Sequence, residues 1–318
     1  GSEMCIRDSD NFKANPIETQ RDTLKELLRT AQNTEYGQQY DFHSLTTPEQ
    51  YRERLPIVHY EDINELIRQT MNGKQNILWP EEIKWFAKSS GTTDAKSKFI
   101  PVSPSSLENC HFRGGKDVVS IFNRLYPEAQ VFSGKTLALG GSSEVNKINT
   151  NCQYGDLSAI LISNTPFWAN FMKTPDSSIM LMSNWEEKLE KICEITIKED
   201  VRCLAGVPSW FLTLIHKILE KTGKSNLYEV WPNLELFIHG GISFVPYRQQ
   251  YQELLPDAKM KYMETYNASE GFFGIQDDPS DSSMLLMLDY GVYYEFMPMS
   301  ETCLLYTSPS PRDISGSR

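Results

Sequence analysis

The 318-residue sequence lacks long hydrophobic runs and an excess of positive charge. No stretch reaches the roughly 18 apolar residues that a membrane helix needs. Against 31 Lys and Arg stand 42 Asp and Glu, which gives a net charge of -11 at pH 7. An acidic surface repels phosphate backbones, so neither a membrane nor nucleic acid is an expected partner. A small anion is not excluded, because a local group of backbone N–H donors can bind it against the overall field.

The sequence also lacks the spacings of a disulfide framework or a metal site. Its six cysteines form no C-x-x-C pair and follow no regular interval, so we predict reduced, mostly buried thiols in a cytoplasmic protein. The histidines do not cluster as metal ligands either. We expect ordinary packing or surface roles for His43, His59, His111 and His216.

The two ends differ from the interior. "MCIRDS" at 4–9 and "CLLYTSPSPRD" at 303–313 lack its periodicity and resemble translated sequencing-adaptor read-through. We therefore expect residues 1–9 and 302–318 to be non-native segments and leave them out of fold reasoning.

The interior alternates between helical and strand-like patterns. Apolar residues at i, i+3, i+4 and i+7 predict helices at 24–31, 63–71, 189–197 and 211–219, and "TPEQ" at 47–50 is a capping box. A longer helix is expected from Ser103-Pro104 to about Pro127. Apolar runs predict strands at 84–88, 99–102, 135–139, 201–206, 234–239 and 259–266, and a strand pair over 284–298 turning at 289–291. This alternation indicates an α/β fold with mixed, mostly parallel sheets flanked by helices.

Small or polar loops leave four of these strands, at 89–98, 140–144, 240–243 and 266–271. In parallel sheets, ligands bind beyond the carboxyl ends of the strands. The first loop, "SSGTTDAKSK", offers hydroxyl groups, a permissive glycine and two lysines, Lys96 and Lys98, which suits an anion. It is not a Walker A loop, because no second glycine precedes a lysine. A plain polar surface connection is the alternative.

Two further loops carry fewer chemical groups. "YNASEG" contains one carboxylate, Glu270, which near bound phosphates would be a Mg²⁺ ligand and otherwise a solvated side chain. "FIHGGIS" contains Gly240 and Gly241, which would let a flat ring lie against the backbone. A His-Gly-Gly loop also occurs in α/β-hydrolases, but no G-x-S-x-G nucleophile elbow follows it here.

Taken together and in order, these loops resemble the signature motifs of the acyl-adenylate-forming superfamily. "SSGTTDAKSK" resembles its phosphate-binding motif, "GVPSWFLTLI" its acyl-pocket element, "HGGIS" its adenine-side glycine loop and "YNASEG" its Tyr-x-x-[ST]-Glu-Gly motif. The sequence resembles most closely the auxin-responsive acyl-acid amido synthetases of the Gretchen Hagen type, in a bacterial form. The segments that carry this resemblance include "ILWPEEIKWFAKSSGTT", "WPNLELFIHGG" and "YNASEGFFGIQ". The resemblance covers roughly residues 10–301.

The resemblance implies that 10–301 is the large N-terminal adenylation domain, incomplete, without its C-terminal lid domain. Lys98, Glu270 and Thr92 would be catalytic, and Glu270 would hold Mg²⁺. Val207, Pro208 and Phe211 would wall the acyl pocket, with core packing as the alternative for Phe211. The residues implied to bind ATP are Ser89, Ser90, Gly91, Thr92, Thr93, Gly240, Gly241, Ile242, Tyr266, Asn267, Ala268 and Ser269.

Two departures qualify this expectation. Asp94 stands where the superfamily has a glycine, and Lys98 aligns with its lysine only after a one-residue shift. The implied reaction activates a carboxylic acid with ATP to acyl-AMP and then joins it to an amino acid. An acyl-CoA ligase, or a nucleotide-binding fragment without turnover, are the alternatives.

Overall fold

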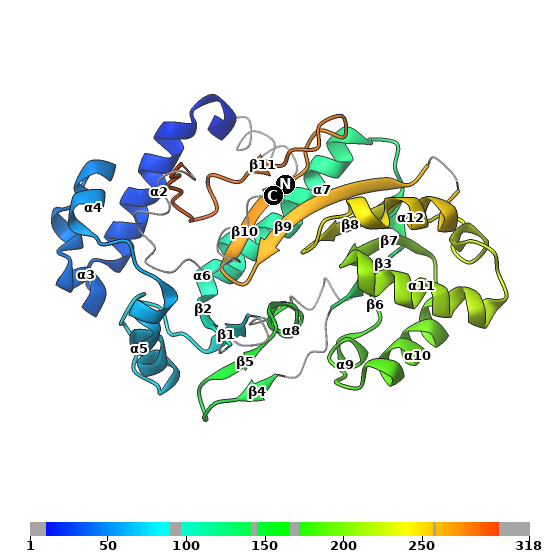
Figure 1. Ribbon diagram of the computed structural model, residues 1–318, viewed down its shortest axis with the longest axis horizontal. Helices are drawn as coiled ribbons and strands as arrows, with labels where there is room; N and C mark the ends of the chain where they lie inside the picture. Colours follow the sequence, from blue (N-terminus) through cyan, green and yellow to red (C-terminus); the bar gives the residue numbers. More distant parts are fainter. Residues whose placement is uncertain (1–10, 90–96, 141–144, 166–171, 257–258, 299–318) are drawn as a thin grey trace.

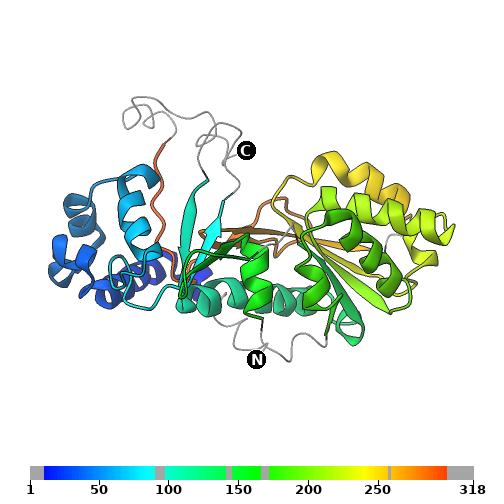
Figure 2. The same cartoon turned by 90° about the horizontal axis from the view of Figure 1, so that it is seen from below.

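The computed structural model describes residues 11–89, 97–140, 145–165, 172–256 and 259–298. Two β-sheets lie side by side, with helices α2–α5 at one end of the molecule and α10–α12 at the other (Figures 1 and 2). The larger sheet has seven strands in the order β11-β10-β9-β8-β7-β3-β6, and the smaller has four in the order β2-β1-β5-β4. The strands are β1 (Trp85–Lys88), β2 (Phe99–Val102), β3 (Lys135–Leu139), β4 (Asn146–Lys147), β5 (Gln153–Gly155), β6 (Lys173–Thr174), β7 (Val201–Gly206), β8 (Leu236–Gly240), β9 (Lys261–Ala268), β10 (Gly271–Ile275) and β11 (Leu285–Leu286).

The predicted mixed α/β class is confirmed. In the larger sheet, β6, β3, β7, β8 and β9 run parallel, whereas β10 pairs antiparallel with both of its neighbours, β9 and β11. In the smaller sheet only the β1–β5 pair is parallel. The helices are α2 (Pro16–Ala31), α3 (Glu35–Gln39), α4 (Pro48–Arg54), α5 (Tyr60–Met71), α6 (Pro104–Ser106), a π-helical turn (Leu107–Phe112), α7 (Arg113–Leu125), α8 (Leu157–Ser163), α9 (Ser177–Met180), α10 (Trp185–Thr196), α11 (Pro208–Thr222) and α12 (Arg248–Leu254).

Strand alternation gives the larger sheet two covered faces. Leu204 and Phe237 pack with α10, α11 and α12 in one apolar core. Cys203, Leu236 and Met263, one residue out of phase, pack with α7 in another. Because successive strand residues point to opposite faces, each short apolar run supplies side chains to both cores.

Several sequence signals act as predicted. The capping box is present: the Thr47 hydroxyl accepts from the Gln50 N–H, and the Gln50 side-chain oxygen Oε1 accepts from the Thr47 N–H. Gly73 ends α5 at φ +101°, and Gly223 ends α11 at φ +65°. The Ser103 hydroxyl accepts from Ser106 N–H and starts the long helix. The helix is continuous to Leu125 but contains the unpredicted π-helical turn.

The predicted strand pair over 284–298 is wrong. Only Leu285–Leu286 is a strand, and the described residues after it form an irregular segment. Gln20 of α2 holds that segment by donating to the carbonyls of Leu288 (2.7 Å) and Val292 (3.0 Å). The segment is apolar because it packs on α2 and α7, not because it alternates across a sheet.

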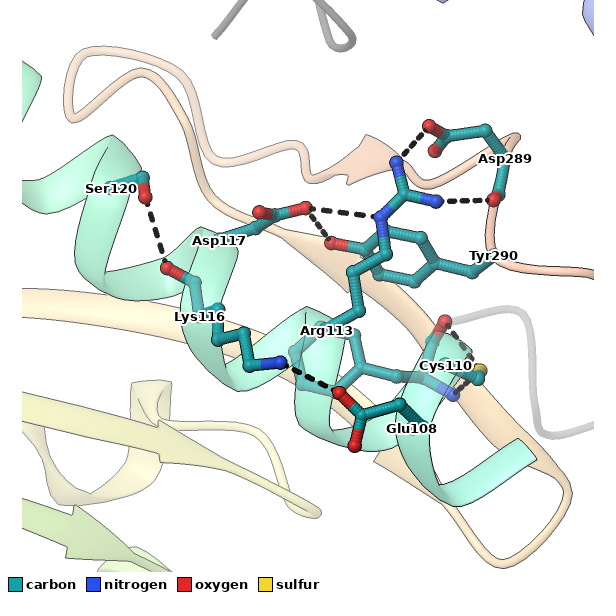
Figure 3. A network of polar contacts seen from close by, with 9 residues as sticks. Glu108, Cys110, Arg113, Lys116, Asp117, Ser120, Asp289 and Tyr290 are labelled. Atoms are coloured by element: carbon teal, nitrogen blue, oxygen red, sulfur yellow. Dashed lines mark hydrogen bonds and ion pairs between the residues drawn. The ribbon is translucent and has the colours of Figure 1, made fainter. Parts of the chain in front are cut away.

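Tyr290, predicted at a turn, is 2% exposed and sits in a polar network with α7 (Figure 3). Its hydroxyl donates to Asp117 Oδ2 at 2.5 Å, and the Arg113 guanidinium lies 5.1 Å from its ring centroid. Arg113 also donates to the Asp289 carbonyl at 2.8 Å and pairs with its carboxylate. Burial raises the pKa of Asp289, and the charge of Arg113 opposes that rise. The network fixes segment 285–298 to α7.

The prediction of reduced, mostly buried thiols is confirmed for the four cysteines that the structure describes. Cys110, Cys152, Cys193 and Cys203 are free and buried, whereas Cys5 and Cys303 lie outside the described residues. Burial raises the pKa of Cys193 to about 11 and that of Cys203 to about 12, so neither is a thiolate at neutral pH.

Candidate functional site

The hydroxyl-rich loop joins β1 to β2, which pair as an antiparallel hairpin. Its base is closed by Ser89 N–H, which donates to the Lys98 carbonyl at 2.9 Å. The Lys98 ammonium lies 5.4 Å from the ring centroid of Tyr60 at the start of α5. The Tyr60 hydroxyl in turn accepts from Phe99 N–H at 2.8 Å, so α5 supports the second strand. The predicted residues Ser90, Gly91, Thr92, Thr93 and Lys96 lie outside the described residues.

The glycine loop begins where β8 ends, and its two glycines have steric reasons. A Cβ on Gly240 would lie 2.2 Å from the Thr265 carbonyl oxygen of β9, which no side chain permits. Gly241 has φ +80°, and a Cβ there would lie 3.6 Å from Val207 Cγ2. Ile242 follows, 38% exposed. The fold therefore brings the glycine loop against β9 on one side and Val207 on the other.

The "YNASEG" motif is a tight hairpin, which corrects the predicted loop. β9 continues through Ala268, which pairs with Gly271 of β10, so only Ser269 and Glu270 form the turn. Tyr266 is 46% exposed and Glu270 is exposed. Both views place this turn beside the β1–β2 hairpin, in the middle of the molecule (Figures 1 and 2).

Of the residues predicted to wall an acyl pocket, Val207 is half-buried and Pro208 opens α11. Phe211 is completely buried, with its ring centroid 5.3 Å from that of Phe237. A Cβ on Gly206 would lie 3.0 Å from the Phe211 ring, so this glycine lets the helix approach β7. Phe211 thus occupies the core, as its alternative role required.

One face of the β8–β9 pair carries ionisable groups next to the glycine loop. His239 is paired in register with Glu264, two residues before Tyr266. The His239 ring stacks on Phe244 at 4.3 Å, and the Arg248 guanidinium lies 5.5 Å from the Phe244 centroid. Burial, helped by Arg248, lowers the pKa of His239 to about 4, so the ring is neutral. Burial raises the pKa of Glu264, and Arg248 opposes that rise.

A second set of charged side chains lies near the carboxyl ends of β5 and β3. Asp156 follows β5, which runs parallel to β1 with Ala87 opposite Gly155, and so lies at the same edge as Lys88. Burial raises the pKa of Asp156 against the charges of Lys88 and Lys188. Lys188 of α10 is 1% exposed, and its ammonium lies 3.4 Å from the Gly140 carbonyl at the end of β3. Burial lowers the pKa of Lys188 against the charge of Asp156. The charges of Asp156, which follows β5, and of Lys188, beside the end of β3, thus influence each other's pKa.

A cavity of about 130 Å³ lies elsewhere, between the end of α5 and β2. Its lining includes Gln75, Trp79 and Ser103 but no residue of the predicted loops. Small-molecule pockets usually enclose about 300–1,000 Å³, so this cavity is too small for a nucleotide. Across the described residues, neither a group of three metal-ligating side chains nor a helix able to cross a bilayer is found.

Two sheets flanked by helices, with the glycine loop and the Tyr266–Glu270 hairpin at the carboxyl edge of parallel strands, have the fold class of the N-terminal domains of adenylate-forming enzymes. Structural comparison supports this class: the chain superposes on an acyl acid amido synthetase solved with 2,4-DB with a TM-score of 0.74 at 17% identity, covering 91% of this chain and 60% of that one. It superposes on 2-hydroxyisobutyryl-CoA ligase with a TM-score of 0.54 at 12% identity, covering 84% and 57%.

Residues 5–260 match the profile of the GH3 family N-terminal domain, and the chain belongs to this family. It is 23% identical to "Indole-3-acetic acid-amido synthetase GH3.4" of Arabidopsis thaliana, covering 89% of this chain and 57% of that protein. It is also 23% identical to "Jasmonoyl--L-amino acid synthetase GH3.5" of Oryza sativa subsp. japonica, covering 94% and 61%. The chain thus spans less than two thirds of these relatives. Both are plant proteins, and a bacterial form stays a prediction.

Several groups near the site were not predicted. The mutual electrostatic influence of Asp156 and Lys188 arises from two distant segments of the chain, and the sequence pattern of α10 did not predict that Lys188 is buried. His111 was expected to be an ordinary packing or surface residue, and it is 4% exposed with Nδ1 2.9 Å from Asn267 Oδ1. His43, His59 and His216 are exposed, as expected.

Proposed function

We propose that the complete protein to which this chain belongs carries out ATP-dependent activation of a carboxylic acid to an acyl-AMP, followed by its conjugation to an amino acid, and that the 318-residue chain alone is inactive. The observation that carries the proposal is the joint placement of Gly240, Gly241 and Tyr266 at the end of parallel strands, in a member of the GH3 family. The relatives' names, amido synthetases of indole-3-acetic acid and jasmonic acid, favour an amide product.

In the first half-reaction, a negatively charged carboxylate must approach the negatively charged phosphates of ATP. A carboxylate oxygen attacks the α-phosphorus of ATP, the bond to the bridging oxygen breaks, and pyrophosphate leaves with its negative charge. Positioning and preorganised donors supply most of the rate enhancement in such reactions. In the second half-reaction an amine attacks the acyl carbon and AMP leaves.

The proposed roles follow from residue chemistry. Ser89, Ser90, Gly91, Thr92 and Thr93 bind the phosphates through hydroxyl and N–H donors. Lys98 faces the charge that develops on the leaving group. On the nucleoside side, Tyr266 lies against the adenine ring, opposite Gly240, Gly241 and Ile242, and the short chain Asn267-Ala268-Ser269 follows. Val207 and Pro208 border the acyl group, with Phe211 behind them.

Mg²⁺ fits the donor set at the hairpin tip. This ion usually takes one or two protein carboxylates and completes its octahedron with water and substrate phosphates. Glu270 is exposed in a two-residue turn, which lets one carboxylate reach a metal–phosphate complex. Bound there, the ion would neutralise phosphate charge.

We further propose that residues 10–301 form the large N-terminal domain, that 1–9 and 302–318 are non-native, and that the complete protein carries a C-terminal lid domain and acts in the cytoplasm. The free, buried cysteines support a reducing compartment. If the lid is required for turnover, the 318-residue chain binds ATP without forming product.

Two experiments separate the candidate functions. Product analysis of the complete protein, supplied with ATP, a panel of carboxylic acids and either amino acids or coenzyme A, should give an acyl-amide. A thioester as the sole product would instead establish the acyl-CoA ligase, a reaction class represented among the structural neighbours. Calorimetric titration of the 318-residue chain with ATP tests binding alone, and absence of heat with and without acid would refute a nucleotide site.

The lysine assignment has its own test. Lys98→Ala should slow acid-dependent ATP–pyrophosphate exchange by about 10²-fold, the usual effect of removing one transition-state donor. Lys96→Ala should slow it much less. The reverse order would place the catalytic lysine two residues earlier.

A further inference from the structure

The π-helical turn Leu107–Phe112 lies against the hairpin that carries Tyr266 and Glu270. π-helical turns are rare and are retained most often near functional sites, because their hydrogen bonds are poorer than those of an α-helix. This one interrupts the helix between α6 and α7. Two consecutive residues of the turn, Cys110 and His111, each contact a different strand of the hairpin.

The contacts converge on a single cross-strand pair, Asn267 of β9 and Phe272 of β10. His111 Nδ1 lies 2.9 Å from Asn267 Oδ1. The Phe272 N–H donates to Cys110 Sγ at 3.1 Å, and the thiol reaches back to the Phe272 carbonyl at 3.8 Å (Figure 3 shows Cys110 on this turn). Side chains of the turn therefore take the place of a neighbouring strand at this end of β10.

Steric fit reinforces the polar contacts. A Cβ on Gly114, one turn further along, would lie 2.4 Å from the Phe272 ring, so the helix approaches the hairpin as closely as glycine allows. The hairpin's backbone also has a register shift between Phe272 and Gly274, directly after the contacted pair. Such a shift weakens the strand ladder locally. External contacts at Asn267 and Phe272 thus hold the hairpin where its own ladder is weakest.

His111 is suited to donate to an amide oxygen. It is 4% exposed, and burial lowers its pKa, so the ring is neutral at pH 7. Facing Asn267 Oδ1, Nδ1 carries the proton. The contact leaves Tyr266 on the opposite side of β9, because neighbouring strand residues point to opposite faces.

We propose that His111 is a positioning residue: by holding Asn267, it sets the Tyr266–Glu270 hairpin at the distance from the β1–β2 hairpin that the nucleotide and its metal require. This inference rests on the proposed function. Few residues separate His111 and Asn267 from the two hairpins. The π-helical turn begins five residues after β2 ends, and Glu270 stands three residues after Asn267. His111 itself touches neither substrate nor metal.

The test compares His111→Leu, which removes the donor, with His111→Asn, whose amide nitrogen replaces Nδ1. His216→Leu, on an exposed face of α11, is the matched control. In the complete enzyme, His111→Leu should raise the KM for Mg-ATP about tenfold or more and leave the KM for the acid within twofold, whereas His111→Asn should stay within about threefold of wild type. A displacement of about 1 Å can cost 10²-fold in rate, so kcat falls as well. A lower kcat with both KM values unchanged would indicate fewer folded molecules and would overturn the inference.

Hydrogen exchange of the 318-residue chain gives a readout that does not depend on catalysis. His111→Leu should speed amide exchange in residues 266–272 about tenfold and leave 99–102 unchanged. Adding Asn267→Ala to His111→Leu should cause little further acceleration, because the second change removes a partner already lost. Unchanged protection in His111→Leu would refute the positioning role even if the adenylation assay succeeds. If wild-type enzyme shows no exchange of pyrophosphate, the proposed function fails, while the protection experiment still decides the role of His111.

Discussion

His239 gives the structure a specific acid sensitivity. Its imidazole is 3% exposed, stacked on Phe244, and kept neutral by burial, with Arg248 adding to the effect. In the unfolded chain the same ring takes up a proton near pH 6.5, whereas in the folded protein its pKa is about 4. As the pH falls between these values, the unfolded state binds a proton that the folded state refuses. Stability contributed by this site is therefore present above pH 6.5 and lost as the pH falls toward 4.

The magnitude follows from the two pKa values. One pKa unit corresponds to about 1.4 kcal/mol, so the interval from 6.5 to about 4 amounts to roughly 3 kcal/mol once both forms have titrated. At pH 5 the expected loss is about 2 kcal/mol. That is a large share of the ~5–15 kcal/mol by which proteins are usually stable.

Urea unfolding at pH 7.5 and pH 5 measures the effect, with His239→Phe as the comparison. Phenylalanine keeps the aromatic stack on Phe244 but cannot titrate, so every other ionisable group cancels between the two proteins. Wild type should lose about 2 kcal/mol more than the variant on going to pH 5. Equal losses in the two proteins would show that His239 titrates normally in the folded state, and would refute the burial argument.

Two further predictions concern packing and buried hydrogen bonds, both measured by urea unfolding. Gly114→Ala forces a methyl group into the Phe272 ring and should lower the free energy of unfolding by about 1–3 kcal/mol. The control Gly115→Ala, whose new methyl group meets nothing within 4 Å, should leave the free energy of unfolding unchanged or raise it by up to about 1 kcal/mol. Equal effects of the two variants would contradict the close approach of α7 to Phe272. Trp231→Phe removes the bond from the indole N–H to the Thr196 carbonyl (2.8 Å, both buried) and should cost about 1–3 kcal/mol, and an unchanged midpoint would show that another donor satisfies that carbonyl.

The elements that were predictable from sequence are those whose signals are local. The apolar stripe of α2, the capping box at Thr47 and the terminal glycines of α5 and α11 act through neighbours within a few residues. The strands that end at Leu139, Gly206 and Gly240 were predictable because short apolar runs followed by small residues mark buried parallel strands.

Elements that depend on distant partners were not predictable. Tyr290 looks like a turn residue in sequence, and its burial depends on distant partners, Asp117, 173 positions earlier, and Arg113 of the same helix, together with the ring of Phe272. Its neighbours in segment 285–298 are held by α2 and α7, so their apolar character is indistinguishable from that of a strand. The π-helical turn left no periodic signal, because Cys110 and His111 are specified by the hairpin that they contact.

For the candidate site, the sequence supplied the chemistry but not the geometry. Glycines at 240 and 241 were expected to admit a flat ring, and the structure adds that Thr265 and Val207 lie against them. The turn at Ser269 and Glu270 was expected to be a longer loop, because Asn267 and Ala268 have low strand propensity. In the structure, pairing with β10 overrides that propensity, and β9 continues through Ala268.

The most direct test of the adenylation proposal is acid-dependent ATP–pyrophosphate exchange by the complete enzyme carrying Glu270→Gln. Glutamine keeps the size of the side chain and removes its charge, and Glu253→Gln on exposed α12 is the matched control. Exchange should fall by at least about 10²-fold in the first variant and remain at the wild-type rate in the second. Wild-type exchange in Glu270→Gln would contradict the assignment of the metal–phosphate site to this hairpin.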